Sequence, residues 1–300
     1  MTRQHRARAL CPSCGATGSR DRLDPDLKVC PPCRERLRWE MSEWLKHLVG
    51  MGVLGTAPAP AADGGAMSAR DGHLWLLPEP AAEAFATRHG GAGLLGPEER
   101  AHLDRLRGAA ARRRFLGGRV LARYALSARS GRPLDTWRVR AGADGRPEPE
   151  PAVAGLRFNL SHTDGMIACL VAAGGTCGVD VERAEAGPDA VRHLPRHFAP
   201  PERAALALLP EGELPARVSA YWVLKEAYLK AVGTGLRRRL AGFSFSPPAA
   251  PPIRLTDPLR PEAENADWHF ELLSPAPGFV LAAAVQGGRG GRIHRTLITP

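Results

Sequence analysis

Two acidic side chains, Asp180 and Glu182, lie two residues apart in the stretch GVDVE. On a β-strand, residues at this spacing leave the same face, so both carboxylates share one spot while Val179 and Val181 point to the core. Magnesium binds one or two carboxylates of this kind and completes its octahedron with water and substrate phosphate. The pattern therefore favours a divalent cation site, although a solvated strand face is the alternative for a D-x-E pair alone.

A third acidic residue, Glu226, lies in the stretch YWVLKEAYLKAVGTGL, which also holds Lys225. On a helix Glu226 follows Trp222 by four residues and precedes Lys230 by four, on a face that differs from the apolar stripe. The alternative is a surface pair between Glu226 and Lys230, worth about 0.3 kcal/mol. Three carboxylates and two lysines together favour a site with chemistry.

Arginine dominates residues 100–123, which hold eight arginines and one acidic residue, a local charge of +7. Because guanidinium groups match phosphate oxygens bidentately, this stretch favours a phosphate-rich ligand, with a solvated basic helix as the alternative. The stretch FNLSHTDG places Asn159, Ser161 and His162 at a strand end. Its hydroxyl and imidazole could donate to phosphate, or they could be satisfied turn residues.

The apolar pattern predicts the elements that position these groups. Strands are predicted at HLWLL, TWRVR, LRFNLSH, MIACLVA, CGVDVE, GFSF, WHFELL, FVLAAAV and RIHRTLI. Helices are predicted at PEERAHLDRLR, AAARRRFLGGRVLARYALSA, within residues 188–209, and at RVSAYWVLKEAYLKAV, which Gly233 caps. The stretches PEPEPAV and SPPAAPP are interpreted as proline-rich loops. Residues 73–300 are therefore predicted to be α+β, with a first half over 73–177 and a second half over 178–300.

The bulk composition indicates a globular protein with an anionic partner. The chain has 300 residues, 44% of them hydrophobic, and a formal charge of +10. This charge favours a nucleic acid, a phosphorylated small molecule or an acidic protein without choosing among them. No run approaches the ~20 apolar residues that cross a bilayer, and the N-terminal stretch lacks the apolar region of a signal peptide. We therefore expect a cytoplasmic protein with no membrane partner.

Four of the six cysteines form a metal-binding pattern near the N-terminus. CPSC and CPPC place Cys11, Cys14, Cys30 and Cys33 in two C-x2-C pairs with fifteen residues between them. This spacing predicts a zinc module over residues 1–48, joined to the rest by a flexible Gly/Ala/Pro-rich linker over residues 49–72. A structural zinc is favoured over a catalytic one, and such modules also bind nucleic acid or protein. Cys169 and Cys177 lie in apolar strands and are expected to be core thiols.

Several motifs in order resemble the 4'-phosphopantetheinyl transferase superfamily. They are GRP at 145–147, FNLSHT at 158–163, GVDVE at 178–182 and WVLKEAYLK at 222–230. The resemblance covers about residues 73–290. It is to the larger, pseudo-dimeric type that activates polyketide and nonribosomal peptide synthetases, including the surfactin synthetase. It implies two similar α+β halves with coenzyme A between them.

The resemblance also implies an activity. Such enzymes move the phosphopantetheine arm of coenzyme A to a serine of an apo acyl or peptidyl carrier protein and release adenosine 3',5'-bisphosphate. The resemblance assigns magnesium, or manganese, to Asp180, Glu182 and Glu226. Glu226, or a water that it orients, takes the serine proton, and Lys230 stabilises charge on the transferring or leaving phosphate. Trp222 is expected to pack and fix the helix.

Coenzyme A contacts are implied for further residues. His162 and Arg114 would hold the 3'-phosphate, while Arg146, Pro147 and Ser161 would line the adenine and phosphate pocket, beside Asp180, Glu226 and Lys230. The family often has lysines upstream of the arginine-rich helix, where this chain has Glu99 and His102. Arg105 or Arg107 could substitute for them.

A rival interpretation belongs to another class of protein. It is a nucleic-acid-binding or regulatory protein that has a zinc ribbon and carries an inactive transferase-like domain. The complete set of Asp180, Glu182, Glu226 and Lys230 favours the enzyme, because a decayed domain is free to lose charged residues that are costly to crowd together. The sequence does not name the carrier protein or the oligomeric state.

Overall fold

The computed structural model describes residues 71–142, 146–287 and 291–299, and three short strands nearer the N-terminus. These are β1 (Arg8–Leu10), which pairs antiparallel with β2 (Thr17–Ser19), and β3 (Gly55–Thr56). Contacts divide the chain into residues 1–55 and 56–300. The four cysteines of the predicted zinc module and nearly all of the predicted linker lie outside the described residues, so both stay predictions.

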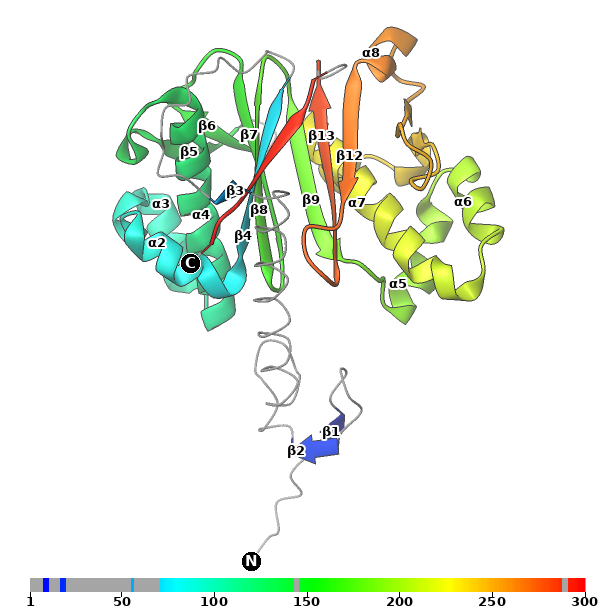
Figure 1. Ribbon diagram of the computed structural model, residues 1–300, viewed down its shortest axis with the longest axis horizontal. Helices are drawn as coiled ribbons and strands as arrows, with labels where there is room; N and C mark the ends of the chain where they lie inside the picture. Colours follow the sequence, from blue (N-terminus) through cyan, green and yellow to red (C-terminus); the bar gives the residue numbers. More distant parts are fainter. Residues whose placement is uncertain are drawn as a thin grey trace, which may run out of the picture. The chain divides into compact units, whose positions relative to one another are not determined.

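The first group of elements in the larger unit is a sheet covered by helices. Strands β4 (Gly72–Pro78), β7 (Leu156–Thr163), β8 (Met166–Ala173) and β14 (Ile293–Leu297) belong to a sheet with the order β3-β14-β4-β8-β7. Helices α2 (Glu79–Arg88), α3 (Pro97–Arg105) and α4 (Ala109–Ser130) lie to one side of these strands in Figure 1. A separate ribbon pairs β5 (Arg138–Ala141) with β6 (Pro147–Glu150).

The second group has its own sheet and helices. Strands β9 (Cys177–Arg183), β12 (Trp268–Leu273) and β13 (Phe279–Gln286) form an antiparallel sheet with the order β12-β13-β9. Helices α5 (Pro188–His193), α6 (Pro200–Ala207) and α7 (Leu214–Val232) lie on the opposite side of Figure 1. A short hairpin of β10 (Ser244–Phe245) and β11 (Leu255–Thr256) and the helix α8 (Glu262–Ala266) complete the group.

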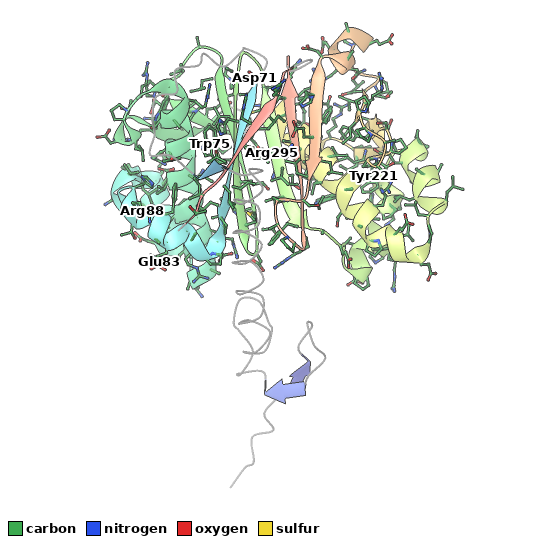
Figure 2. All side chains as sticks on the ribbon, viewed as in Figure 1. Asp71, Trp75, Glu83, Arg88, Tyr221 and Arg295 are labelled. Atoms are coloured by element: carbon green, nitrogen blue, oxygen red, sulfur yellow. The ribbon has the colours of Figure 1, made fainter. Side chains whose placement is uncertain are left out.

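Each group buries a separate hydrophobic core. Figure 2 labels Trp75 of the first core, which gathers side chains from β4, β7, β8, α2 and α4, and Tyr221 of the second, which gathers them from α7, β12 and β13. Cys169 and Cys177 are buried thiols, as expected. Among the described residues, no helix is long and apolar enough to cross a membrane.

Most predicted strands and helices are confirmed, and the mixed α+β class with them. The interpretation of PEPEPAV as a loop was wrong, because β6 pairs with β5 there. Pro147 and Pro149 are two residues apart on β6, so the backbone nitrogens of both point to the same edge of the ribbon. A strand tolerates proline at an unpaired edge, because no ladder hydrogen bond is lost there. Helix α2 was not predicted. The division at residues 177 and 178 stays a prediction, and β14 of the second half runs parallel to β4 in the first sheet.

Gly178 allows helix α7 to lie directly against β9. A Cβ atom at this position would lie 2.0 Å from the carbonyl oxygen of Ala227 and 2.7 Å from the backbone nitrogen of Ala231. The glycine of GVDVE is thus a packing requirement, and the same contact sets the height of Glu226 and Lys230 above Asp180. The helix ends as predicted at Gly233, whose φ of 74° is left-handed.

A buried ion pair fixes the outer side of α7. Lys225 and Glu202 have fully buried side chains, and Lys225 Nζ lies 2.8 Å from Glu202 Oε2. The ammonium also donates to the carbonyl oxygens of Leu240 and Phe243, each at 2.8 Å. Glu202 in turn accepts the N–H groups of Ala199 and Phe245. Lys225 therefore joins α7 to α6 and the following loop, and it is not among the residues that line the site described below.

The Gly178 contact predicts a destabilising substitution. Gly178→Ala should lower the free energy of unfolding by about 1–3 kcal/mol or more, because the new methyl group meets backbone that cannot move aside cheaply. Chemical denaturation measures the effect. Gly212→Ala is the control, since nothing lies within 4 Å of the added Cβ atom, and it should stay within about 0.5 kcal/mol of the parent. Equal stabilities for the two variants would contradict the packing argument.

The buried ion pair predicts a second effect on stability. Lys225→Met should cost about 3–5 kcal/mol in denaturant unfolding, because it leaves the carboxylate of Glu202 buried without its counter-charge. Adding Glu202→Gln to this variant should recover part of the loss. If Lys225→Met unfolds at the same denaturant concentration as the parent, the pair does not hold α7 in place.

Candidate active site at the junction of two edge strands

Two edge strands from different sheets meet through side chains. Strand β7 is an edge strand of one sheet and β9 is an edge strand of the other. No ladder of backbone hydrogen bonds joins the two strands. Instead, Asn159 Oδ1 accepts the N–H of Val179 at 3.0 Å, and Ser161 Oγ accepts the N–H of Val181 at 3.3 Å. The partners advance together along the chain, so the two strands run parallel. Asn159 and Ser161 thereby satisfy donors that an exposed strand edge would leave to solvent.

This junction places Asp180 and Lys230 together. Ser161 Oγ donates to Asp180 Oδ1 at 2.9 Å, and Lys230 Nζ donates to the same carboxylate oxygen at 2.6 Å. Lys230 also donates to Ser161 Oγ at 3.0 Å and to the carbonyl oxygen of Val179 at 3.2 Å. At the end of β7, Thr163 Oγ1 donates to Glu182 Oε2 at 3.1 Å. Strand β7 thus orients both carboxylates of β9.

The carboxylates of the site repel one another. Burial, followed by the negative charge of Asp180, raises the pKa of both Glu182 and Glu226. Lys230 opposes this effect in both cases but does not cancel it. Together Asp180, Glu182, Glu226 and Lys230 carry a formal excess of negative charge in a partly buried place. Further positive charge at this place would therefore stabilise the ionised carboxylates.

Two oxygens of the site also lack hydrogen-bond donors. Among the residues that the structure describes, Asp180 Oδ2 and Glu226 Oε1 are buried without a partner. No three metal-binding side chains of residues 71–142, 146–287 and 291–299 are already gathered as a ligand set. Buried carboxylate oxygens of this kind are costly unless a donor or a cation satisfies them. The donor set, oxygen only and negatively charged, fits a hard divalent cation.

A cavity of about 410 Å³ opens over these carboxylates. Asp180, Glu182, Glu226 and Lys230 line it together with Ser161 and His162 of β7. Helix α4 forms another part of the wall with Arg114, Phe115, Gly118 and Arg119, and Leu160, Ile167 and Trp222 add apolar surface. Trp222 also packs against the second core, as expected for a residue that fixes the helix. The cavity therefore combines side chains from both groups of elements.

His162 and Arg114 lie at the α4 side of this cavity. Arg114 Nη1 lies 3.0 Å from Glu79 Oε2 and 2.5 Å from Asp164 Oδ1. Burial, followed by the positive charge of Arg114, lowers the pKa of His162. A neutral imidazole and a guanidinium therefore face the cavity together, and both can donate to an anion.

Several other arginines of this region bind groups of the protein itself, although their charge favoured a phosphate ligand. Arg123 forms a buried ion pair with Glu99, at 2.5 Å, and Arg119 lies 3.3 Å from the same carboxylate. Arg112 donates to the carbonyl oxygen of Leu103 at 2.6 Å. The local charge of +7 is thus partly matched by carboxylates and carbonyls of the protein itself. Glu99 serves α3–α4 packing, while His102, Arg105 and Arg107 are exposed and do not line the cavity.

Arg146 and Pro147 do not line the cavity either. Arg146 Nη1 donates to the carbonyl oxygen of Ala231 at 2.8 Å and to Thr176 Oγ1 at 3.2 Å. Its guanidinium also pairs with Glu148 at 2.9 Å. Arg146 therefore satisfies the carbonyl oxygen of Ala231, which follows Lys230 in the last turn of α7.

Several residues that line the cavity or hold its lining side chains were not predicted from the sequence. Glu79, which holds Arg114, directly follows the apolar strand β4 but carries no motif. Phe115, Gly118 and Arg119 lie on the turn after Arg114, and only helical spacing could have placed them on its face. Thr163 lies two residues after Ser161 on β7, so strand alternation was a usable signal for it.

Comparisons with known proteins agree with this site. A sequence model described as the 4'-phosphopantetheinyl transferase superfamily matches residues 176–284, which include Asp180, Glu182, Glu226 and Lys230. The 4'-phosphopantetheinyl transferase HetI of a Nostoc species is 31% identical over 219 residues, which cover 72% of this chain and 87% of that protein.

A second sequence relative is similarly close, whereas one solved structure matches only weakly. A phosphopantetheinyl transferase of a Thraustochytrium species is 30% identical over 222 residues, 65% of this chain and 74% of that one. A holo-(acyl-carrier-protein) synthase of Bacillus anthracis, solved in complex with CoA, aligns over 37% of this chain and 94% of its own, with 21% identity and a TM-score of only 0.29. By its sequence relatives, the chain belongs to the 4'-phosphopantetheinyl transferase superfamily and is an enzyme of this class.

Proposed function

We propose that this enzyme transfers the phosphopantetheine arm of coenzyme A to a serine of an apo acyl or peptidyl carrier protein, with magnesium, and releases adenosine 3',5'-bisphosphate. One observation carries the proposal. A single cavity is lined by Asp180, Glu182, Glu226 and Lys230. Two buried carboxylate oxygens of these residues have no partner in the described part of the chain. The names of the relatives support the same reaction.

Asp180, Glu182 and Glu226 would hold the cation. Asp180 Oδ2 and Glu226 Oε1 are the oxygens with unused acceptor capacity, and Glu182 lies on the same strand face as Asp180. A bound divalent ion supplies charge neutralisation for the diphosphate under attack. Manganese, which prefers similar oxygen ligands, is the expected substitute.

The reaction moves one proton and exchanges one bond to phosphorus. The serine oxygen of the carrier forms a bond to the β-phosphorus of coenzyme A, and the bond from that phosphorus to the leaving adenosine 3',5'-bisphosphate breaks. Glu226, or a water that it orients, accepts the serine proton. Its carboxylate lines the cavity that the serine must enter.

Lys230 has a separate task in this reaction. Its ammonium already lies at the cavity wall, held by Asp180 and Ser161. From that place it donates to the transferring phosphoryl group or to the leaving phosphate, where negative charge develops. Ser161 positions Lys230 and Asp180 through its hydroxyl and is not itself the nucleophile.

The rest of coenzyme A is assigned by the same proposal. His162 and Arg114 bind the 3'-phosphate, and Arg146 and Pro147 lie with the adenine, outside the cavity described above. The chain is of the larger, pseudo-dimeric type, and its acidic carrier protein is attracted by the net positive charge. Cys11, Cys14, Cys30 and Cys33 hold a structural zinc.

Glu226→Gln should slow transfer strongly. Removing a general base typically slows a reaction by about 10²–10⁴-fold, because the serine proton then has no acceptor. Intact-mass spectrometry of several apo carrier proteins, incubated with coenzyme A and magnesium, measures the gain of the phosphopantetheinyl mass. Glu185→Gln removes the same charge from an exposed position in the loop between β9 and α5, and this variant should keep full activity. Parent-level transfer by Glu226→Gln would remove it from the mechanism.

Magnesium should stabilise the free protein through the unsatisfied oxygens. At a concentration of about 100 times its Kd, a ligand adds roughly 2.7 kcal/mol to the free energy of unfolding. We therefore expect magnesium to raise the thermal midpoint of the parent and of Glu185→Gln, and to have a much smaller effect on Asp180→Asn. Differential scanning calorimetry with and without the cation makes the comparison. An equal response of Asp180→Asn and the parent would place the cation elsewhere.

A further inference from the structure

The guanidinium of Arg114 is bound by two carboxylates that differ in how firmly they are held. Glu79 and Asp164 both lie within ion-pair distance of Arg114 Nη1, at 3.0 and 2.5 Å. The side chain of Glu79 is 8% exposed, whereas that of Asp164 is 51% exposed. This difference decides which of the two can leave when another anion arrives.

Glu79 is fixed by a set of independent contacts. Besides Arg114, its carboxylate accepts Nη2 of Arg113 at 3.3 Å and the N–H of Gly165 at 3.0 Å. Its own N–H donates to the carbonyl oxygen of Gly165 at 3.0 Å. The start of α2 is therefore bound from both directions to the turn between β7 and β8. Moving the Glu79 carboxylate away from Arg114 would also break its contacts with Arg113 and with the N–H of Gly165.

Asp164 lies in that same turn, two residues after His162. Among the described residues, its one side-chain contact is the ion pair with Arg114, and half of its side chain is in solvent. An ion pair with one partner half in solvent contributes little free energy, because water competes for the exposed carboxylate. A side-chain rotation of Asp164 frees one face of the guanidinium at small cost.

Arg114 is also a wall residue of the cavity, beside His162. A phosphate that enters there carries more negative charge than a carboxylate and can accept from the guanidinium and the imidazole together. It would compete with Asp164 for Arg114, and it would not compete with Glu79, which stays in place beneath.

We propose that Glu79 is a positioning residue that holds Arg114 at the cavity wall, and that Asp164 is a competing internal anion which the 3'-phosphate of the nucleotide displaces. This inference rests on the proposed function for the identity of the nucleotide. It adds that two residues without a place in the reaction set the affinity for that nucleotide in opposite directions. Asp164 weakens binding and Glu79 strengthens it.

The test is equilibrium binding of adenosine 3',5'-bisphosphate by isothermal titration calorimetry to the full chain. Asp164→Asn should bind roughly two- to five-fold more tightly than the parent, which is the fold-change that corresponds to an exposed ion pair. Asp189→Asn, an exposed substitution on α5 with the same charge change, should leave the affinity unchanged. Adenosine 5'-monophosphate, which lacks the 3'-phosphate, should bind equally to all three proteins.

Other results would overturn the inference. Weaker or equal binding by Asp164→Asn would mean that Asp164 does not compete. Equal tightening by Asp189→Asn would assign the effect to net charge, and tightening that extends to adenosine 5'-monophosphate would assign it to another part of the nucleotide. No binding to any of the proteins would remove the phosphate site itself. Because binding needs no carrier protein, failure here is separate from failure to transfer the arm.

A second variant tests the positioning residue. Glu79→Gln keeps the side-chain shape but removes the charge that holds Arg114, and we expect at least a five-fold loss of affinity for adenosine 3',5'-bisphosphate. In a transfer assay the same loss should appear in KM for coenzyme A, with kcat nearly unchanged. A fall in kcat alone would indicate a structural role. If Glu79→Gln does not fold, Glu79→Asp takes its place in both assays, and the Asp164→Asn titration still decides whether Asp164 competes.

Discussion

Two side chains of β7 replace a backbone ladder where the two sheets meet, and the rest of the site depends on them. Asn159 and Ser161 satisfy N–H groups of β9, an edge strand of the other sheet. Because these contacts fix the register of β9 against β7, they also fix which carboxylates of β9 face the cavity. A slip by one residue would turn Asp180 and Glu182 into the core and bring valines to the surface. The chemistry of the site is therefore a consequence of register.

Helix α7 adds the other half of the site under two constraints. On its inner side, Gly178 allows backbone contact with β9, which brings Glu226 and Lys230 close to Asp180. On its outer side, the buried pair of Lys225 and Glu202 holds the helix to α6. Neighbouring residues of one motif thus serve separate purposes, since Lys225 stabilises the helix while Glu226 and Lys230 face the cavity. Lys230, which pairs with Asp180, offsets part of the negative excess that results.

The period of each element explains what the sequence could predict. Alternation on β9 placed Asp180 and Glu182 on one face, and helical spacing on α7 placed Glu226 and Lys230 off its apolar stripe. The resemblance to the family, and not the spacing, joined the two sets in one site. The partners of Asn159, Ser161 and the arginines of α4 were not predictable, because they depend on how separate elements meet. Glu99 illustrates this, since its position before the arginine-rich helix gave no sign of its buried ion pair with Arg123. Helix α2 was missed because Pro80 and several alanines give it no strong apolar stripe.

The most direct test of this account is a crystal structure of the chain with coenzyme A and magnesium. We expect one ion in contact with Asp180 Oδ2 and Glu226 Oε1, at the roughly 2.0–2.1 Å typical of magnesium and oxygen, with the diphosphate of coenzyme A completing its coordination. Ser161 should still bridge β7 to β9, and Lys230 should face the diphosphate. An ion or a nucleotide bound away from these carboxylates, with the junction of β7 and β9 unchanged, would contradict the central claim.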